Sequence, residues 1–108
     1  MALVISILHI VAAPRSRAEV VRPLAVQLRA TRAKPGYLQC DLFQRLENLD
    51  AIALMEEWAS QADLDLRFRS EEDRAVLATI ELSCEPPGIL FDTVTRRGGL
   101  ERAAVASR

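Results

Sequence analysis

The first apolar segment of the chain is the feature that most restricts its fold. Residues 3–11, LVISILHIV, are rich in β-branched and aliphatic side chains, which favour a strand. Its two polar members, Ser6 and His9, would point to opposite faces, because side chains alternate along a strand. Both faces are therefore mostly apolar, and we expect a central strand that is buried on both sides.

A helical pattern follows this strand. Ser16 and Glu19 are placed as a capping box, and apolar residues then recur at helical spacing as far as Thr31. Lys34-Pro35-Gly36 joins a proline to a glycine, which is typical of a helix stop and a turn. The first strand is therefore expected to lead through a helix into the next element.

Two strands and two short helices account for the middle of the chain. Residues 37–46 alternate, residues 51–59 are largely apolar, and a short polar turn separates the two predicted strands. Ser60 is expected to cap the next helix and Ser70 to begin another. Residues 89–95 form the last predicted strand. The order is strand, helix, strand, strand, a helix in two pieces, and strand.

This βαββαβ order predicts an α+β protein with a ferredoxin-like fold, in which helices cover one face of a four-stranded antiparallel sheet. The other face would be apolar and uncovered. Burying ~1,000 Å² of such surface is worth on the order of 25 kcal/mol before ordering costs, so we expect a second copy to cover it as a homodimer. We assign this domain to residues 1–97, and residues 98–108 to a C-terminal tail or short helix.

Composition and charge argue against several functions. The 14 basic and 15 acidic residues give a net charge of -1, so neither nucleic acid nor a membrane is an expected partner. The sequence has no glycine-rich phosphate loop and no apolar run of ~18 residues, and we expect a cytoplasmic protein. Cys40 and Cys84 lack neighbouring ligand residues, so no metal site is predicted. We expect two small apolar thiols, although a disulfide stays open.

Three short motifs connect these elements to a known family. They are Thr31-Arg32 with Pro35-Gly36-Tyr37, then Glu56-x-Trp58, and finally the run from Leu64 to Ser70. With the element order of residues 3–95, they resemble the antibiotic biosynthesis monooxygenases and their relatives, the dimeric α+β barrels. The resemblance implies a monooxygenase that needs no cofactor and acts on a small aromatic such as a phenol, a hydroquinone or a polyketide.

One position departs from the family pattern. Where the family usually has a histidine as the fourth residue of the third motif, this chain has Arg67. In haem-degrading relatives a histidine of this region holds the iron, and a guanidinium cannot do so because it stays protonated. The departure argues against haem degradation.

The resemblance and the strand patterns together suggest three catalytic residues, His9, Glu56 and Trp58. The family places Trp58 beside a cavity between sheet and helices, where its indole would stack on an aromatic substrate, unless it is a plain core tryptophan. Glu56 would act as a base, or form a structural ion pair with Arg67. His9 would be an alternative base or a core histidine.

The candidate substrate-binding residues are Tyr37, Trp58, Arg67 and Phe68. Tyr37 and Phe43 are expected to share a face of their strand, where they would line a pocket or fill the barrel of the dimer. The acidic run of residues 71–73 suits a helix N-terminus and is given no other role.

Two other functions stay open. A non-catalytic small-molecule-binding or dimerisation module of the same fold would be favoured if Arg67 blocked the cavity by pairing with Glu56. A non-oxidative isomerase or cyclase would turn over its substrate without oxygen. An oxygenase, by contrast, needs a pocket beside Trp58 that is roomy enough for one aromatic ring.

Overall fold

The computed structural model describes residues 3–83, 85 and 88–94. Its elements are β1 (Leu3–Val11), α1 (Arg17–Thr31), β2 (Tyr37–Gln44), β3 (Ala51–Trp58), α2 (Gln61–Phe68), α3 (Glu71–Ile80) and β4 (Gly88–Val94). The predicted βαββαβ order, with the second helix in two pieces, is confirmed. Cys84 and the predicted tail of residues 98–108 lie outside the described residues.

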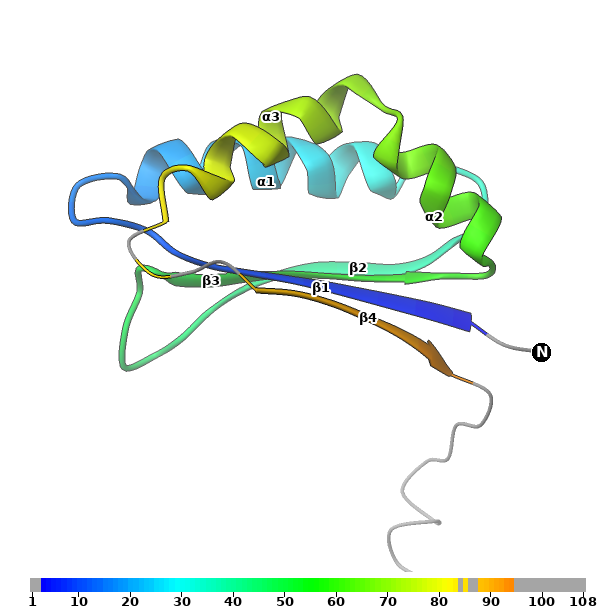
Figure 1. The fold of residues 1–108 in the computed structure, drawn as a ribbon, viewed down its shortest axis with the longest axis horizontal. Coiled ribbons are helices and arrows are strands. Elements are labelled where there is room, and N and C mark those ends of the chain that lie inside the picture. The colour runs from blue at the N-terminus through cyan, green and yellow to red at the C-terminus, as the bar shows by residue number, and fades with distance from the viewer. Residues whose placement is uncertain (1–2, 84, 86–87, 95–108) are drawn as a thin grey trace, which may run out of the picture.

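The four strands form one antiparallel sheet in the order β2-β3-β1-β4, and all three helices lie on the same side of it (Figure 1). This is the ferredoxin-like α+β fold. The two central strands, β1 and β3, are paired so that Ser6 lies opposite Glu56 and Leu8 opposite Leu54. Even-numbered residues of both strands therefore share one face of the sheet.

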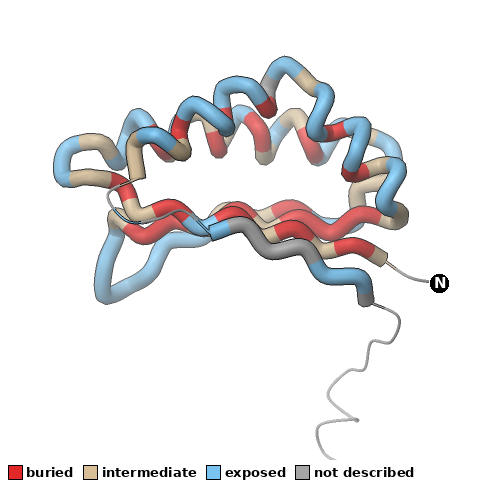
Figure 2. Tube along the Cα trace, viewed as in Figure 1, coloured by how far each residue is buried: buried red, intermediate tan, exposed pale blue. Residues whose placement is uncertain are grey.

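The core lies between this face and the helices, where the buried segments of the two layers meet (Figure 2). The buried residues of the central strands on this face are Val4, Ser6, Leu8, Ile10, Ile52, Leu54, Glu56 and Trp58. From the helices, Val20 and Leu24 of α1, Leu64 of α2 and Val76 of α3 complete the apolar part. The helices thus pack on a sheet face that is apolar except around Ser6 and Glu56.

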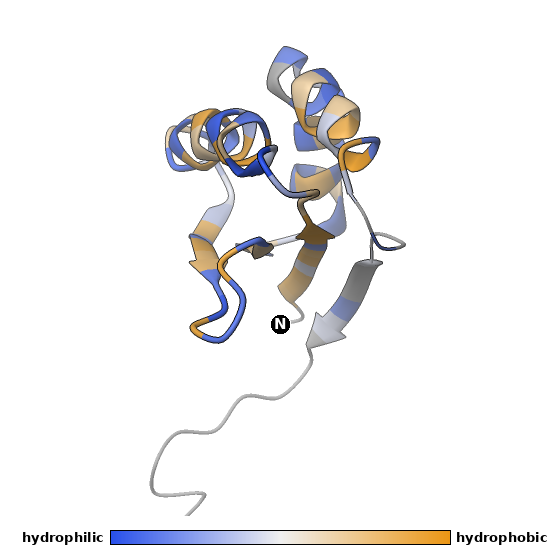
Figure 3. Ribbon diagram, turned by 90° about the vertical axis from the view of Figure 1, so that its left-hand side faces the viewer, coloured by the Kyte–Doolittle hydropathy of each residue, from blue (hydrophilic) through white to orange (hydrophobic). Residues whose placement is uncertain are grey.

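The opposite face of the sheet has no cover among the described residues (Figure 3). The apolar residues that β1 presents there, such as Ile5 and Ile7, are only partly buried, and His9 is exposed. β1 is central, as predicted, but the expectation that both of its faces are buried is wrong within this chain. None of the described helices is both long and apolar enough to cross a membrane.

Tyr37 and Phe43 do not share a face, contrary to the expectation from simple alternation. The pairing of β2 with β3 shifts between Tyr37 and Gln39, as at a β-bulge. Tyr37 consequently packs against Trp58 on the helix side, whereas Phe43 is 49% exposed on the other side. One inserted residue is enough to reverse the face, because side chains alternate with a period of two.

The helix starts differ in how their backbone N–H groups are satisfied. Ser16 is the N-cap residue of α1, as predicted, but the predicted capping box is wrong, because the Ser16 side chain accepts no capping hydrogen bond. The predicted cap by Ser60 is confirmed: its Oγ accepts from the backbone N–H of Asp63 and donates to the Asp63 carboxylate. Ser60 therefore holds Asp63 in the first turn of α2 through hydrogen bonds to both its backbone N–H and its carboxylate.

Gly36 connects this turn to the end of the first helix. Its φ of 83° lies in the left-handed region, and a Cβ built there would lie 2.2 Å from the Asp63 Cγ. The backbone of Gly36 also accepts a hydrogen bond from the N–H of Ala59. The Pro-Gly-Tyr motif therefore does more than end a helix, because its glycine leaves room for the capped start of α2.

We predict that Gly36→Ala lowers the free energy of unfolding by about 2 kcal/mol or more, because it combines a left-handed φ with a steric clash against Asp63. Gly88→Ala is the matched control, since its Cβ would make only an ordinary contact of 3.8 Å with the His9 Cβ. Urea denaturation of both variants checks the prediction. Equal losses in the two variants would show that the Asp63 contact does not constrain position 36.

Candidate functional site

A buried group of charged side chains lies between the sheet and the helices. Arg67, at the end of α2, donates from Nε to Glu56 Oε1 on β3 at 2.9 Å and from Nη1 to Asp73 Oδ1 on α3. The side chains of Arg67 and Glu56 are only 4% and 1% exposed. The expected Glu56–Arg67 ion pair is present, and Asp73 adds a second carboxylate to the guanidinium.

The first helix completes this polar group. Thr31 donates its hydroxyl to Glu56 Oε1 at 3.1 Å and accepts from Gln27 Nε2 at 3.0 Å, and both residues are fully buried. Thr31 and Gln27 lie one turn apart on α1. The network therefore ties β3 to α1 as well as to α2 and α3. Thr31 belongs to the first motif of the chain, which gives that position a physical reason to be polar.

Asp73 is the member of this network that the sequence interpretation missed. The acidic run was expected to serve only as a helix N-terminus, but Asp73 is 5% exposed and paired with Arg67. Burial raises the pKa of its carboxyl, and the Arg67 guanidinium offsets part of that rise. The signal was available, because Asp73 shares a helical stripe with Val76 and Ile80, both of which pack on the core.

Three buried polar atoms of this region have no hydrogen-bond partner among the described residues: Gln27 Oε1, Glu56 Oε2 and Trp58 Nε1. Each such atom costs about 1–3 kcal/mol compared with a satisfied one. Unsatisfied groups that cluster in this way usually mark a place where water or a ligand makes the missing bonds.

Two cavities border the network, and Arg67 lines both. The inner one, between α2–α3 and β1, has a volume of about 50 Å³ and is lined by Ser6, Arg67 and Phe68 among others. An apolar cavity of about 150 Å³ is known to admit benzene, so the inner cavity is too small for an aromatic ring. The second is a cleft of about 200 Å³ that includes Trp58, and we call it the Trp58 cleft.

The Trp58 cleft opens between the end of α1 and the helix α2. Its lining residues are Lys34, Pro35, Trp58, Asp63, Leu66, Arg67 and Ser70. The indole forms the deep wall, since Trp58 is only 1% exposed, whereas Leu66 is 64% exposed at the surface. One carboxylate, Asp63, and two cationic side chains, Lys34 and Arg67, also reach this cleft.

The structure divides the suggested site residues into two groups. Trp58 and Arg67 line the Trp58 cleft, and Tyr37 packs against the cluster that contains Trp58. Phe68 lines the inner cavity, and the Arg67 guanidinium lies over its ring. Glu56 lies behind Arg67 and lines neither cavity.

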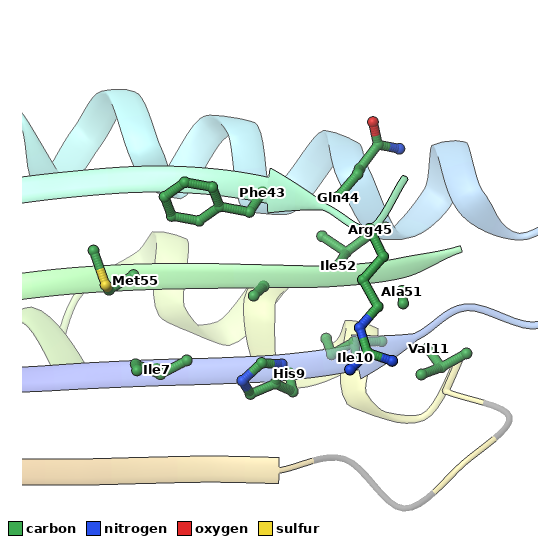
Figure 4. A pocket seen from close by; sticks show the side chains of 11 residues that line it. Ile7, His9, Ile10, Val11, Phe43, Gln44, Arg45, Ala51, Ile52 and Met55 are labelled. Atoms are coloured by element: carbon green, nitrogen blue, oxygen red, sulfur yellow. The ribbon is translucent and has the colours of Figure 1, made fainter. Parts of the chain in front are cut away.

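His9 belongs to the second group. It lies on the opposite face of the sheet, in a separate cavity of about 430 Å³ (Figure 4). His9 and Trp58 therefore cannot act on the same ring, because the sheet separates them.

Comparison with known proteins settles the family. The family described as antibiotic biosynthesis monooxygenase matches residues 3–79. The chain belongs to this family. Among the described residues of this family member, no group of three or more His, Cys, Asp or Glu side chains could hold a metal ion.

Solved structures show the same fold at low sequence identity. Rv0793 from Mycobacterium tuberculosis superimposes with a TM-score of 0.80 at 21% identity, covering 90% of this chain and 99% of its own. PA3566 from Pseudomonas aeruginosa gives 0.75 at 23% identity, covering 91% and 97%. A structure named antibiotic biosynthesis monooxygenase gives 0.76 at 20% identity, covering 86% and 99%. No curated protein sequence matches the chain.

We predict that Arg67→Met lowers the free energy of unfolding by about 3–5 kcal/mol, because it leaves two carboxylates buried without their counter-charge. Arg17→Met is the matched control, since Arg17 pairs with Asp50 at the surface, where an ion pair is worth about 0–1 kcal/mol. Urea denaturation at neutral pH measures both. A loss for Arg67→Met no larger than that of the control would contradict a stabilising role for the network.

Cys40 provides a pH-dependent probe of the same region. It is a free, buried thiol, as predicted, and burial together with the nearby Glu56 charge raises its pKa to about 12. The folded state therefore keeps its proton at a pH where the unfolded thiol, with a pKa of about 8.5, has lost it. The stabilisation that the buried Cys40 thiol provides is present below the pKa of the unfolded thiol, and it is lost as the pH rises towards about 12.

We predict that the stability difference between the wild-type protein and Cys40→Ala shrinks by about 1 kcal/mol per pH unit above pH ~9. Other titrating groups cancel in this difference, because both proteins carry them. Denaturant unfolding at several pH values between ~8 and ~11 provides the measurement. Parallel curves would mean that the buried thiol titrates normally.

Proposed function

We propose that this protein is a cofactor-independent monooxygenase that binds a small electron-rich aromatic, such as a phenol or hydroquinone, in the Trp58 cleft. The observation that carries the proposal is the cleft of about 200 Å³ with an indole as its deep wall, which is large enough for one aromatic ring. Membership of the monooxygenase family supports the reaction class. The proposed substrate class, a small aromatic, is inferred from the volume of the Trp58 cleft and from its indole wall.

Each polar residue of the cleft then has a role in the reaction. Asp63 is the carboxylate that lines the cleft, so we assign it the removal of the phenolic proton. Lys34 and Arg67 would stabilise the resulting phenolate and the negative charge that develops on oxygen. Glu56 would act through Arg67, whose guanidinium it holds at 2.9 Å.

The proposed reaction needs no external reductant. The phenolate transfers one electron to O₂, the ring radical and superoxide combine at a ring carbon, and the peroxide collapses to a carbonyl with loss of water. A phenol and O₂ thus give a quinone and H₂O, and each product receives one of the two atoms of O₂. The protein supplies a binding surface, a base and positive charge, all of which its own residues provide.

One observation favours a second candidate, a non-catalytic binding or dimerisation module. Arg67 is paired with both Glu56 and Asp73, and the inner cavity beside it has only about 50 Å³. A family member that used the inner cavity for chemistry would need that space. In this alternative the Trp58 cleft binds a small molecule without turning it over.

We also propose a cytoplasmic homodimer formed through the uncovered sheet face. Partly buried apolar residues such as Ile5 and Ile7, together with the exposed Phe43, support this arrangement, because a second copy would remove them from water. A two-fold pairing of this kind is the commonest way in which identical chains associate. The Trp58 cleft lies on the other side of the sheet and stays accessible in such a dimer.

We predict that hydroquinones or naphthols quench the fluorescence of Trp58 saturably, and that at least one of them increases O₂ uptake above the rate without protein. Leu66→Tyr narrows the cleft from its surface and should weaken both effects about tenfold or more, since a blocked site loses the ring contacts. Leu46→Tyr is the matched control, because Leu46 is 94% exposed and outside the cleft.

The outcomes separate the two candidate functions. Quenching that Leu66→Tyr removes, without O₂ uptake for any compound, would support the binding module and contradict the oxygenase. Equal quenching in Leu66→Tyr and Leu46→Tyr would remove the Trp58 cleft from both candidates.

A further inference from the structure

Arg67 is the one residue, among those that the structure describes, that lines both the Trp58 cleft and the inner cavity. The cleft has a volume of about 200 Å³ and the inner cavity about 50 Å³. Leu8 of β1 and Val76 and Ile80 of α3 give the inner cavity a largely apolar lining. Apolar space of this kind would be favourable for a second ring of a bound aromatic, if it were continuous with the cleft.

The guanidinium of Arg67 is held in this position by residues of three elements. Glu56 of β3 accepts a hydrogen bond from Nε at 2.9 Å, and Asp73 of α3 accepts one from Nη1. The guanidinium carbon also lies 5.2 Å from the centre of the Phe68 ring at the end of α2, as in a cation–π contact. Because a guanidinium that left this place would strand two buried carboxylates, the boundary between the two spaces is fixed.

The Trp58 cleft is therefore closed at its inner end and open at its mouth. The indole of Trp58 at the deep wall is 1% exposed, whereas Leu66 at the surface is 64% exposed. A single aromatic ring fits against the indole in a space of this volume. A second fused ring has to stay at the mouth in contact with water, because the Arg67 side chain occupies the way to the inner cavity.

We propose that Arg67 is the specificity-determining residue that limits the ligand of the Trp58 cleft to one buried aromatic ring. This inference rests on the function proposed above and narrows its substrate class to monocyclic phenols and hydroquinones. A shorter side chain at position 67 would join the two spaces, and a second ring would then be buried between α3 and β1. The volume of the Arg67 side chain sets the limit, and its charge holds the side chain in place.

The test compares hydroquinone with 1,4-naphthohydroquinone, which differ by one fused ring, through the quenching of Trp58 fluorescence under nitrogen. Trp58 is the only tryptophan of the chain. In the wild-type protein the two dissociation constants should agree within about threefold, because a ring that stays in water adds little. In Glu56→Gln/Arg67→Ala/Asp73→Asn the naphthohydroquinone should bind about tenfold more tightly than hydroquinone, or better, because its second ring leaves water. The two amides ensure that no buried carboxylate loses its counter-charge.

Two controls separate the volume of the side chain from its charge and from the size of the inner cavity. Glu56→Gln/Arg67→Met/Asp73→Asn has the same neutral background and a side chain that still fills the boundary, so it should keep the wild-type ratio of the two dissociation constants. Phe68→Ala enlarges the inner cavity but leaves the guanidinium in place, so it should keep this ratio as well. Urea denaturation shows which variants fold, and Arg67→Val in the neutral background replaces the alanine variant if that protein does not unfold cooperatively.

Three results would overturn the inference alone. They are equal ratios in the alanine and methionine variants, a wild-type protein that already binds the naphthohydroquinone about tenfold more tightly, and a changed ratio in Phe68→Ala. None of them affects O₂ uptake by the wild-type protein, and with it the proposed function. The absence of saturable quenching by either ligand, in contrast, would remove the Trp58 cleft as a site, and the proposed function would fail together with the inference.

Discussion

The buried guanidinium of Arg67 is the interaction on which the arrangement of the layers depends. It joins Glu56 of the central strand β3 to Asp73 of α3, while Thr31 of α1 hydrogen-bonds to the same carboxylate. A charge this deep in the protein persists only if its partners are held in place. The apolar core packs the helices on the sheet, whereas this polar network fixes where along the sheet each helix sits.

The network also determines what the interior can hold. Because Arg67 lies between the inner cavity and the Trp58 cleft, the space between sheet and helices is divided rather than continuous. Arg67 fills this space with a long side chain whose charge is compensated by two carboxylates. The larger of the two spaces is therefore the outer cleft, where Asp63 and Lys34 line the same surface as the indole of Trp58.

Much of this arrangement could be predicted from residue patterns. Side-chain alternation along the predicted strand of residues 51–59 placed Glu56 and Trp58 on one face, and Arg67 was a candidate partner for Glu56 because a lone buried carboxylate is costly. Tyr37 was assigned to the wrong face, because a bulge depends on the pairing of two strands and leaves no mark in one of them. Asp73 was missed although it lies on the apolar stripe of its helix.

The sequence by itself determined the order of elements, the face that Glu56 and Trp58 share on β3, and the family, because these depend on local periodicity and short motifs. Only the tertiary structure decided that His9 and Trp58 lie on opposite faces of the sheet. The reason is physical: a shift of one residue in strand register would exchange the two faces, and register is set by pairing between distant segments. Cavity volumes likewise follow from how separate elements pack, which no single segment encodes.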